Sequence, residues 1–300
     1  MTQLEQLYRL LTDRCPGLEV RREEPMSRHT SFRIGGPAAL MALPRTGEQA
    51  RAALEAAKEA GVVPFFLGNG SNLLVPDGGV ERFLLKTTGL DWVEREGNCL
   101  TAGGGVTLAR LARFALEEGL TGLEFAGGIP GTLGGAVTMN AGAYGGEMKD
   151  LVRSVKCLNG AGEEEQVTRL DFGYRRSAFS NGERMILSAR LELRPGDREA
   201  IRSRMEELSA QRQAKQPLEY PSAGSMFKRP PGHFAAALID QCGLKGLTVG
   251  GAQVSEKHAG FVVNRGGATC ADVLALVEQV RARVLAETRV ALEMEVRVLT

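Results

Sequence analysis

The spacing of apolar and polar residues predicts helices and short strands in alternation through the first two thirds of the chain. Residues 1–15 form a charged amphipathic helix, and the next helix begins at Thr46, with Gln49 three residues later as in a capping box. A third helix is predicted from Thr107 to Glu118. Short apolar segments between these helices predict strands at 62–67, 82–87, 100–106, 151–158, 166–168 and 184–193.

A change in composition marks the start of the last third. A charged helix begins near Pro195 and reaches about Lys215, and the proline-containing link 216–221 follows it directly. We therefore place a domain boundary near residues 195–216. Beyond the link, the pattern predicts helices at 233–242 and 270–287 and a strand at 260–264.

The end of the chain has the alternation of a half-buried strand. Over residues 290–299, apolar side chains occupy every second position, and Glu293 and Glu295 stand on the other face. This pattern predicts a final edge strand. Its polar side either faces solvent or carries chemistry.

The segment Gly122–Gly145 has an unusual composition. One third of its residues are glycine, and it contains no lysine or arginine. Glycine lets a backbone adopt positive φ and approach a ligand closely, so we interpret the segment as a cofactor cradle with free N–H donors. The alternative is a glycine-rich region packed against other backbone. The loop Gly68–Asn72, directly after a predicted strand, is a second candidate for phosphate binding.

Two common nucleotide-binding motifs are absent from the sequence. Gly103–Gly105 precedes a helix, but Leu108 stands where a GxGxxG motif has its third glycine, and no acidic ribose partner follows. No GxxxxGK[ST] motif occurs. The chain therefore has neither a Rossmann fingerprint nor a P-loop.

Composition excludes several classes of protein. The net charge of the 300 residues is +1 and only 5% are aromatic, which argues against a nucleic-acid partner. The five cysteines are scattered and the three histidines lack ligand-like neighbours, so we expect no disulfide framework and no metal site. No apolar run is long enough to span a membrane, and residues 1–15 are unlike a signal peptide. We expect a cytoplasmic protein without membrane insertion.

Six motifs, in order from about His29 to the C-terminus, carry a resemblance to a known family. They are HTSFRIGG, GNGSNLL, EFAGGIPGTLGGAVTMNAGAYG, YRRSAF, SAGSMFKRP and LEMEVR. Together they resemble the UDP-N-acetylenolpyruvoylglucosamine reductases, the MurB family. The resemblance implies an α+β fold, with a two-part FAD-binding region of the vanillyl-alcohol oxidase/PCMH type and a smaller α+β substrate-binding domain. The implied division is 1–90 and 91–200 for the two FAD-binding subdomains and 201–300 for the substrate domain.

The resemblance also implies the reaction. Such an enzyme reduces the enolpyruvyl ether of UDP-N-acetylglucosamine to UDP-N-acetylmuramate for peptidoglycan, and so serves cell-wall biogenesis, cell shape and cell division. NADPH is the reductant, and noncovalently bound FAD passes the hydride from N5 to C3 of the substrate. The positions expected to bind FAD are Gly68, Asn69, Gly70, Ser71, Asn72, Gly127, Ile129, Pro130, Gly131, Thr132, Gly135, Asn140, Ala141, Gly142 and Ala143.

Three positions match the family's catalytic residues. Arg175 matches the arginine that binds the substrate carboxylate and steadies the enolate, and its neighbour Arg176 is read as exposed. Ser225 matches the serine that delivers a proton to C2. For the C-terminal glutamate, the motif favours Glu293 over Glu295.

Lys215 and Arg229 are candidate substrate-binding residues. The chain lacks the insertion that carries a lid tyrosine in one subclass, so it resembles the shorter subclass. Arg229 stands where the lid-bearing subclass has asparagine. What covers the uridine diphosphate remains open, as does the oligomeric state.

Two other functions remain as alternatives. An FAD-dependent oxidase or dehydrogenase of the same fold would keep the glycine-rich loops but has no use for the GSMF and LEME segments. A flavin- or nucleotide-sugar-binding protein without activity would not need Arg175, Ser225 and Glu293.

Overall fold

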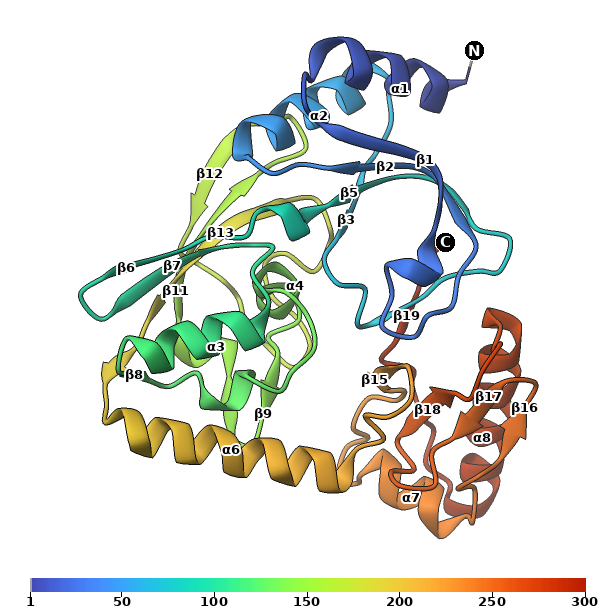
Figure 1. The fold of residues 1–300 in the computed structure, drawn as a ribbon. Coiled ribbons are helices and arrows are strands. Elements are labelled where there is room, and N and C mark those ends of the chain that lie inside the picture. Colours follow the sequence, from blue (N-terminus) through green and yellow to red (C-terminus); the bar gives the residue numbers. More distant parts are fainter. Residues whose placement is uncertain (1) are drawn as a thin grey trace. The chain divides into compact units, whose positions relative to one another are not determined.

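The structure is a computed structural model, and it describes residues 2–300. The chain forms two compact units, each assembled from segments that are apart in the sequence (Figure 1). Unit 1 comprises Met1–Arg22, Ala39–Asn69 and Arg82–Gln211. Unit 2 comprises Glu23–Ala38, Gly70–Glu81 and Arg212–Thr300. These units do not follow the predicted division at residues 90 and 200, because two N-terminal segments belong with the C-terminal unit.

The first hydrophobic core of unit 1 lies around two N-terminal helices. The helices are α1 (Gln3–Arg14) and α2 (Gly47–Glu59), and the sheet beside them has the order β1-β2-β5-β3. The strands are β1 (Glu19–Pro25), β2 (Pro37–Leu43), β3 (Phe65–Leu67) and β5 (Val80–Lys86). Leu7, Leu11, Leu54 and Phe83 are buried together in this core. The predicted helix at Thr46 is confirmed. The cap is not a full capping box, because the Gln49 side chain accepts from the N–H of Arg45 and not from that of the N-cap residue Thr46.

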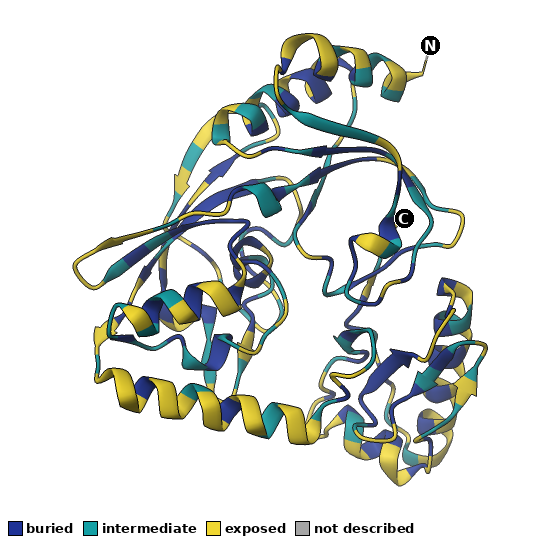
Figure 2. Cartoon of the chain, in the orientation of Figure 1, coloured by how far each residue is buried: buried dark blue, intermediate teal, exposed yellow. Residues whose placement is uncertain are grey.

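The second core of unit 1 is built on an antiparallel sheet with the order β12-β11-β13-β7-β6. Its strands are β6 (Val93–Glu96), β7 (Cys99–Gly103), β11 (Val152–Leu158), β12 (Glu164–Val167) and β13 (Met185–Glu192). Helix α3 (Leu108–Glu117) contributes Leu108, Leu111 and Ala112 to this core. Helix α6 (Arg198–Lys215) is mostly exposed, with only Ile201 and Leu208 buried (Figure 2).

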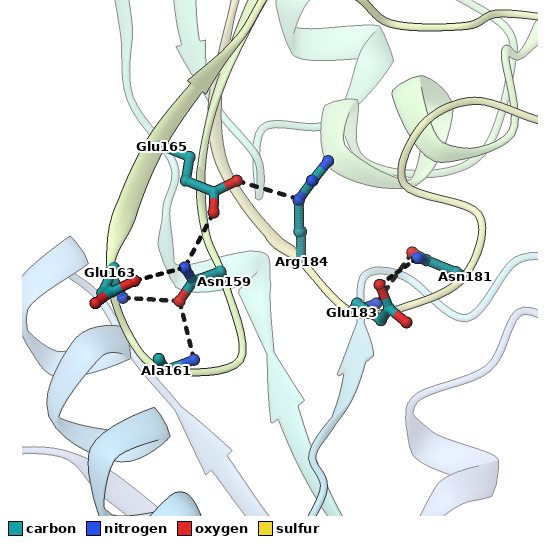
Figure 3. A network of polar contacts seen from close by, with 7 residues as sticks. All are labelled: Asn159, Ala161, Glu163, Glu165, Asn181, Glu183 and Arg184. Carbon is teal, nitrogen blue, oxygen red and sulfur yellow. Dashed lines mark hydrogen bonds and ion pairs between the residues drawn. The ribbon is translucent and has the colours of Figure 1, made fainter.

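The turn between β11 and β12 shows how one asparagine can organise a hairpin. The Asn159 side-chain oxygen accepts from the N–H groups of Ala161 and Glu163. Its amide nitrogen donates to the carboxylates of Glu163 and Glu165, and Glu165 also pairs with Arg184 at 3.2 Å (Figure 3). All hydrogen-bonding groups of this amide are used within the hairpin.

Several short elements complete unit 1. They are η2 (Thr87–Gly89), β8 (Leu120–Thr121), η3 (Glu124–Ala126), α4 (Leu133–Thr138), β9 (Gly142–Ala143), β10 (Gly146–Glu147), α5 (Met148–Leu151) and β14 (Arg194–Pro195). The predicted glycine-rich cradle thus contains one 3-10 turn, one short helix and one short strand, joined by turns. Tyr144 and Gly145 both have positive φ and form the two-residue tip of the β9–β10 hairpin.

Unit 2 packs a four-stranded sheet against a long helix. The strand order is β15-β18-β17-β16, and the apolar face of α8 (Cys270–Thr288) closes the core together with α7 (Ala235–Gln241). The strands are β15 (Ser222–Ser225), β16 (Thr248–Val249), β17 (Ala252–Val254) and β18 (Phe261–Asn264). Phe32, Ile34 and Leu74 also enter this core, which explains why 23–38 and 70–81 belong to unit 2.

Hydrogen bonds also tie the N-terminal segment 70–81 to the C-terminal part of unit 2. η1 (Met26–Arg28) leads into the turn that follows it, and β4 (Leu73–Leu74) pairs in parallel with β19 (Arg297–Val298). Thr269 and Asp272 form a capping box at the start of α8. The Asp77 carboxylate adds two bonds to the first N–H groups of the same helix, at 2.7 and 3.1 Å.

The predicted edge strand over 290–299 is wrong. Only β19 is regular strand there, and Met294 forms an isolated bridge to Phe227. The backbone changes partner within the segment, since Glu295 donates to Met226 while Arg297 donates to Asn72. The alternation therefore fails at Glu295, which is buried.

Candidate active site

The end of β3 meets the start of α4 inside unit 1. A side chain at Gly68 would lie 2.5 Å from the Thr132 hydroxyl, so only glycine permits this approach. Thr132 is buried and is the N-cap of α4, with its hydroxyl 3.5 Å from the N–H of Gly135. Two stretches expected to bind the cofactor, Gly68–Asn69 and Gly127–Thr132, are thereby brought together at this contact.

The second half of the Gly68–Asn72 loop belongs to unit 2. Gly70 has a φ of +58°, and a side chain there would lie 2.3 Å from the carbonyl oxygen of His29. The Ser31 N–H donates to the Gly70 carbonyl, and the Ser31 hydroxyl donates to the Ser222 carbonyl at 2.7 Å. Ser31 therefore joins the loop to β15, the strand that ends at Ser225.

His29 is held by a buried carboxylate within the same segment. Its Nε2 lies 2.7 Å from Glu24 Oε1, and both side chains are largely shielded from solvent. Its carbonyl oxygen lies close to Gly70, as described above. This arrangement is consistent with an organising role for His29 beside the loop.

Most backbone N–H groups of the glycine-rich segment are already used within the protein. Leu133 donates to Val106, Gly134 to Gly104, and Ala141 to Ala136. The expectation of many free donors along 122–145 is therefore wrong for α4 and the residues after it. Glycine serves close packing at several positions: a side chain at Gly142 would lie 2.7 Å from the Gly146 oxygen, and Gly127 lies beside Met205.

The remaining expected cofactor residues fall into two groups. Ile129, Pro130 and Gly131 lie in the turn before α4, and Gly131 has a φ of +138° that requires glycine. Ala141 follows α4, and Gly142 and Ala143 form β9. The loops 68–72 and 127–132 contain no acidic side chain. Neutral donors and close backbone suit the pyrophosphate of FAD, so the residues present fit this cofactor.

Gly103–Gly105 has a structural role. Side chains at these glycines would lie 2.1–2.5 Å from the carbonyl oxygens of Leu90, Ile186 and Thr87. The segment packs against neighbouring backbone, as expected of a sequence that lacks the Rossmann fingerprint.

Arg175 lies at the tip of a tight turn in unit 1. The N–H of Gly173 donates to the Arg176 carbonyl, and the N–H of Arg176 donates back to Gly173, leaving Tyr174 and Arg175 as the two central residues. Arg175 has a φ of +55°, a conformation that costs an L-residue about 1–2 kcal/mol. Such strain is found preferentially at functional positions. Arg176 is exposed, as predicted.

The backbone next to Ser225 is bonded to the C-terminal segment within unit 2. Ser225 ends β15 opposite Phe261, and the next residue, Met226, accepts from the N–H of Glu295. Glu293 pairs with the Lys228 ammonium group, and its side chain is 72% exposed. Glu295 is only 6% exposed. The two glutamates thus differ sharply in environment, which the alternating pattern had hidden.

The candidate substrate-binding residues are both in unit 2. Lys215 is exposed in the last turn of α6. The Arg229 guanidinium stacks on the ring of Phe234, 4.0 Å from its centroid, and Phe234 is 60% exposed. Among residues 2–300, no group of three or more His, Cys, Asp or Glu side chains could hold a metal ion, and no helix is long and apolar enough to cross a membrane.

Two models of known protein families match this chain, and together they define its class. The model of the FAD binding domain matches residues 38–168, and the model of the C-terminal domain of UDP-N-acetylenolpyruvoylglucosamine reductase matches 216–299. The chain is therefore an FAD-binding flavoprotein with an additional C-terminal domain.

Full-length relatives define the family. A UDP-N-acetylenolpyruvoylglucosamine reductase from Geobacillus kaustophilus is 46% identical over 100% of this chain and 99% of that protein. The reductase from Pediococcus pentosaceus is 46% identical over 96% of this chain and 97% of that protein. The crystal structure of the Thermus caldophilus reductase matches with a TM-score of 0.80 and 37% identity, covering 94% of this chain and 99% of that one. The chain belongs to the UDP-N-acetylenolpyruvoylglucosamine reductase family. The predicted family, α+β fold and FAD cofactor are confirmed.

Proposed function

We propose that this chain reduces the enolpyruvyl ether of UDP-N-acetylglucosamine to UDP-N-acetylmuramate, with NADPH as reductant, in the synthesis of peptidoglycan precursors. The observation that carries the proposal is the full-length similarity to reductases of that name, which includes both the FAD-binding region and the C-terminal domain. Bound FAD supplies the hydride for C3 of the substrate. The residues of the chain bind the substrate, stabilise developing charge and deliver a proton to C2.

Arg175 binds the substrate carboxylate in this proposal. Negative charge spreads into the carboxylate as C3 is reduced, and a guanidinium stays charged at any physiological pH. The turn that carries Arg175 supports this role. The backbone of Arg175 has a strained, positive φ, and such strain is concentrated at functional positions.

Ser225 delivers the proton to C2. A hydroxyl is a weak acid, so it has to be held against the basic carbon. β15 supplies this support, since Ser222 accepts from Ser31 and Met226 bonds to both Gly260 and Glu295. The residue before Ser225 is Gly224, whose φ of +78° sets the direction in which the strand ends.

Glu295 takes the role that the motif had suggested for Glu293. A carboxyl group that acts on an enolate or relays a proton works best when it is shielded from water, and Glu295 is the buried one of the pair. Glu293 instead forms a surface ion pair with Lys228. The sequence offered no signal for this choice, because both glutamates stand between apolar residues, and only the burial of Glu295 in the folded chain separates them.

Lys215 and Arg229 contact the diphosphate of the substrate. Both are cationic and belong to unit 2, and Arg229 is supported by the Phe234 ring. Lys215 is exposed at a helix C-terminus, where a cation is favourable without any ligand, so the support for Arg229 is stronger. We place the reaction in the cytoplasm. The five free cysteines suit a reducing compartment.

Anaerobic absorbance spectroscopy tests this function. The purified protein is first reduced with NADPH and then mixed with enolpyruvyl-UDP-N-acetylglucosamine. We expect the flavin bands to bleach with NADPH and to return with the substrate in the absence of oxygen. Bands that return only in air indicate an oxidase of the same fold, and a protein without flavin contradicts the proposal.

The Ser225→Ala variant separates the two half-reactions. NADPH should bleach its flavin at the wild-type rate, because Ser225 takes no part in that step. Reoxidation by the substrate should slow by about 10²–10⁴-fold, the usual contribution of a positioned general acid. Equal rates of reoxidation in the variant and the wild type would exclude Ser225 as the proton donor.

A further inference from the structure

Asn140 lies in the glycine-rich segment and was expected to bind the cofactor, but its side chain is fully engaged within unit 1. It is 5% exposed and adopts a φ of +43° directly after the C-cap of α4. Its amide nitrogen donates to Glu147 Oε2 at 2.8 Å and to the Gly173 carbonyl at 3.2 Å. Its amide oxygen accepts from the N–H of Lys149 at 2.9 Å. No amide hydrogen is left for a ligand.

The orientation of this amide is fixed by its neighbours. The Lys149 N–H can only face an oxygen, and the Glu147 carboxylate and the Gly173 carbonyl can only accept. Glu147 is in turn held by the Lys149 ammonium group at 2.8 Å. The ion pair with Lys149, followed by the hydrogen bond from Asn140, lowers the pKa of Glu147, so it remains an acceptor at neutral pH.

The bond to Gly173 reaches the turn that carries Arg175. Gly173 is the first residue of that turn and its carbonyl also accepts from Arg176. On the other side of the turn, the hydroxyl groups of Ser177 and Ser180 both donate to the Thr138 carbonyl, at 3.0 and 3.2 Å. Hydrogen bonds thus connect both ends of the turn to the end of α4.

From this geometry we propose that Asn140 is a positioning residue, which fixes the Arg175 turn to the glycine-rich segment and so sets where the guanidinium meets the substrate. The proposal rests on the proposed function of Arg175. A turn with a strained central residue has alternatives of lower backbone energy, and anchors at its two ends restrict it to one of them. Asparagine suits the anchor because it tolerates positive φ better than most residues.

The test uses Asn140→Asp, which keeps the shape and the tolerance of positive φ but removes both donated bonds. Asn159→Asp is the matched control, because the Asn159 amide also donates two bonds and accepts from backbone N–H groups, and these bonds go to Ala161, Glu163 and Glu165 within the β11–β12 hairpin (Figure 3). In Asn140→Asp, we expect FAD content and the rate of bleaching by NADPH to stay within about twofold of wild type. Reoxidation by the substrate should slow by about 10–100-fold, the effect of a small misplacement of a catalytic group.

A double-mutant cycle distinguishes positioning from an independent contribution. In an Arg175→Ala background, Asn140→Asp should have no further effect on reoxidation, because it acts through the missing side chain. An equal loss in both backgrounds would overturn the proposal. So would a loss of FAD or of NADPH-dependent bleaching in Asn140→Asp, which would restore Asn140 as a cofactor ligand.

Amide hydrogen exchange gives a readout that does not depend on activity. Asn140→Asp should increase exchange at Arg176 and Ala178, whose N–H groups bond within and beside the turn, and Asn159→Asp should not. Unchanged protection of these amides from exchange in Asn140→Asp would refute the proposal that Asn140 fixes the turn, even if the chain has another function. A wild-type protein that the substrate does not reoxidise would refute the proposed function instead, so the two failures can be told apart.

Discussion

Arg175 combines an unfavourable backbone conformation with a proposed catalytic charge, and substitutions can separate the two. Its φ of +55° costs about 1–2 kcal/mol for any residue with a Cβ. Glycine avoids this cost but loses about 0.5–1 kcal/mol through its greater freedom in the unfolded chain. Arg175→Gly should therefore be more stable than Arg175→Ala by up to about 1.5 kcal/mol, with a central value of about 0.8 kcal/mol. Comparing these two variants cancels every contact that the guanidinium makes.

The stability difference is measurable as a melting temperature. For a domain of 150–250 residues, 1 kcal/mol corresponds to about 2–4 °C, so Arg175→Gly should melt about 1–4 °C above Arg175→Ala. Differential scanning fluorimetry of the two variants at equal FAD saturation measures this difference. Equal melting temperatures would refute the strain argument.

The activity of the two variants should not follow their difference in stability. Both variants lose the cation, so both should reduce the rate of flavin reoxidation by the substrate by about 10²–10³-fold, the usual loss when one stabilising donor is removed. Arg175→Lys should lose less of this rate, because lysine keeps the positive charge although it lacks the planar, bidentate guanidinium group. Arg176→Ala is the matched control and should react like the wild type, since Arg176 is exposed. Wild-type rates in Arg175→Gly would refute its role at the carboxylate.

The other predictions concern unit 2. Glu295→Gln should slow flavin reoxidation strongly, while Glu293→Gln should change it less than about threefold, because exposed ion pairs contribute little. Stopped-flow absorbance measures both rates, and a larger loss in Glu293→Gln would assign the catalytic role to Glu293. Burial lowers the pKa of His258, whose Nδ1 accepts from Gly260, so its folded state favours the neutral ring. This contribution to stability is complete above the unfolded pKa of about 6.5 and is lost as the pH falls toward the lower folded value. The melting temperature of His258→Gln should therefore fall less with decreasing pH than that of the wild type. An equal pH dependence in the two proteins would contradict this role of His258. Asp77→Ala removes two bonds to the first turn of α8 and should lower the melting temperature by about 2–4 °C, as expected for about 1 kcal/mol; an unchanged value would show that the Thr269 box caps the helix without it.

Local patterns predicted the helices well and the irregular segments poorly. Thr46, Thr107 and Thr269 each cap a helix at the expected position, because a cap and an amphipathic repeat depend on neighbours a few residues away. The predicted strand at 62–67 shortens to β3, and the edge strand at 290–299 reduces to β19. A strand depends on partners elsewhere in the chain, and alternation alone does not show where those partners end.

The candidate site divides in the same way. Gly68, Arg175 and Ser225 could be proposed as site residues from the sequence because the motifs around them are specific. Asn140 was expected to bind the cofactor, and the sequence could not show that its side chain bonds to Gly173, 33 residues further along the chain. A sequence shows which hydrogen-bonding groups exist but not which of them the protein itself has used.

The sequence by itself determined the family, the cofactor, the position of most helices and the glycine-rich loops. These follow from short-range properties: residue type, spacing and backbone freedom. The tertiary structure decided that residues 23–38 and 70–81 belong to unit 2, that Glu295 is the buried glutamate, and that Asn140 donates to Gly173 in the Arg175 turn. Each of these depends on burial or bonding between distant segments, and only the folded chain sets which segments meet.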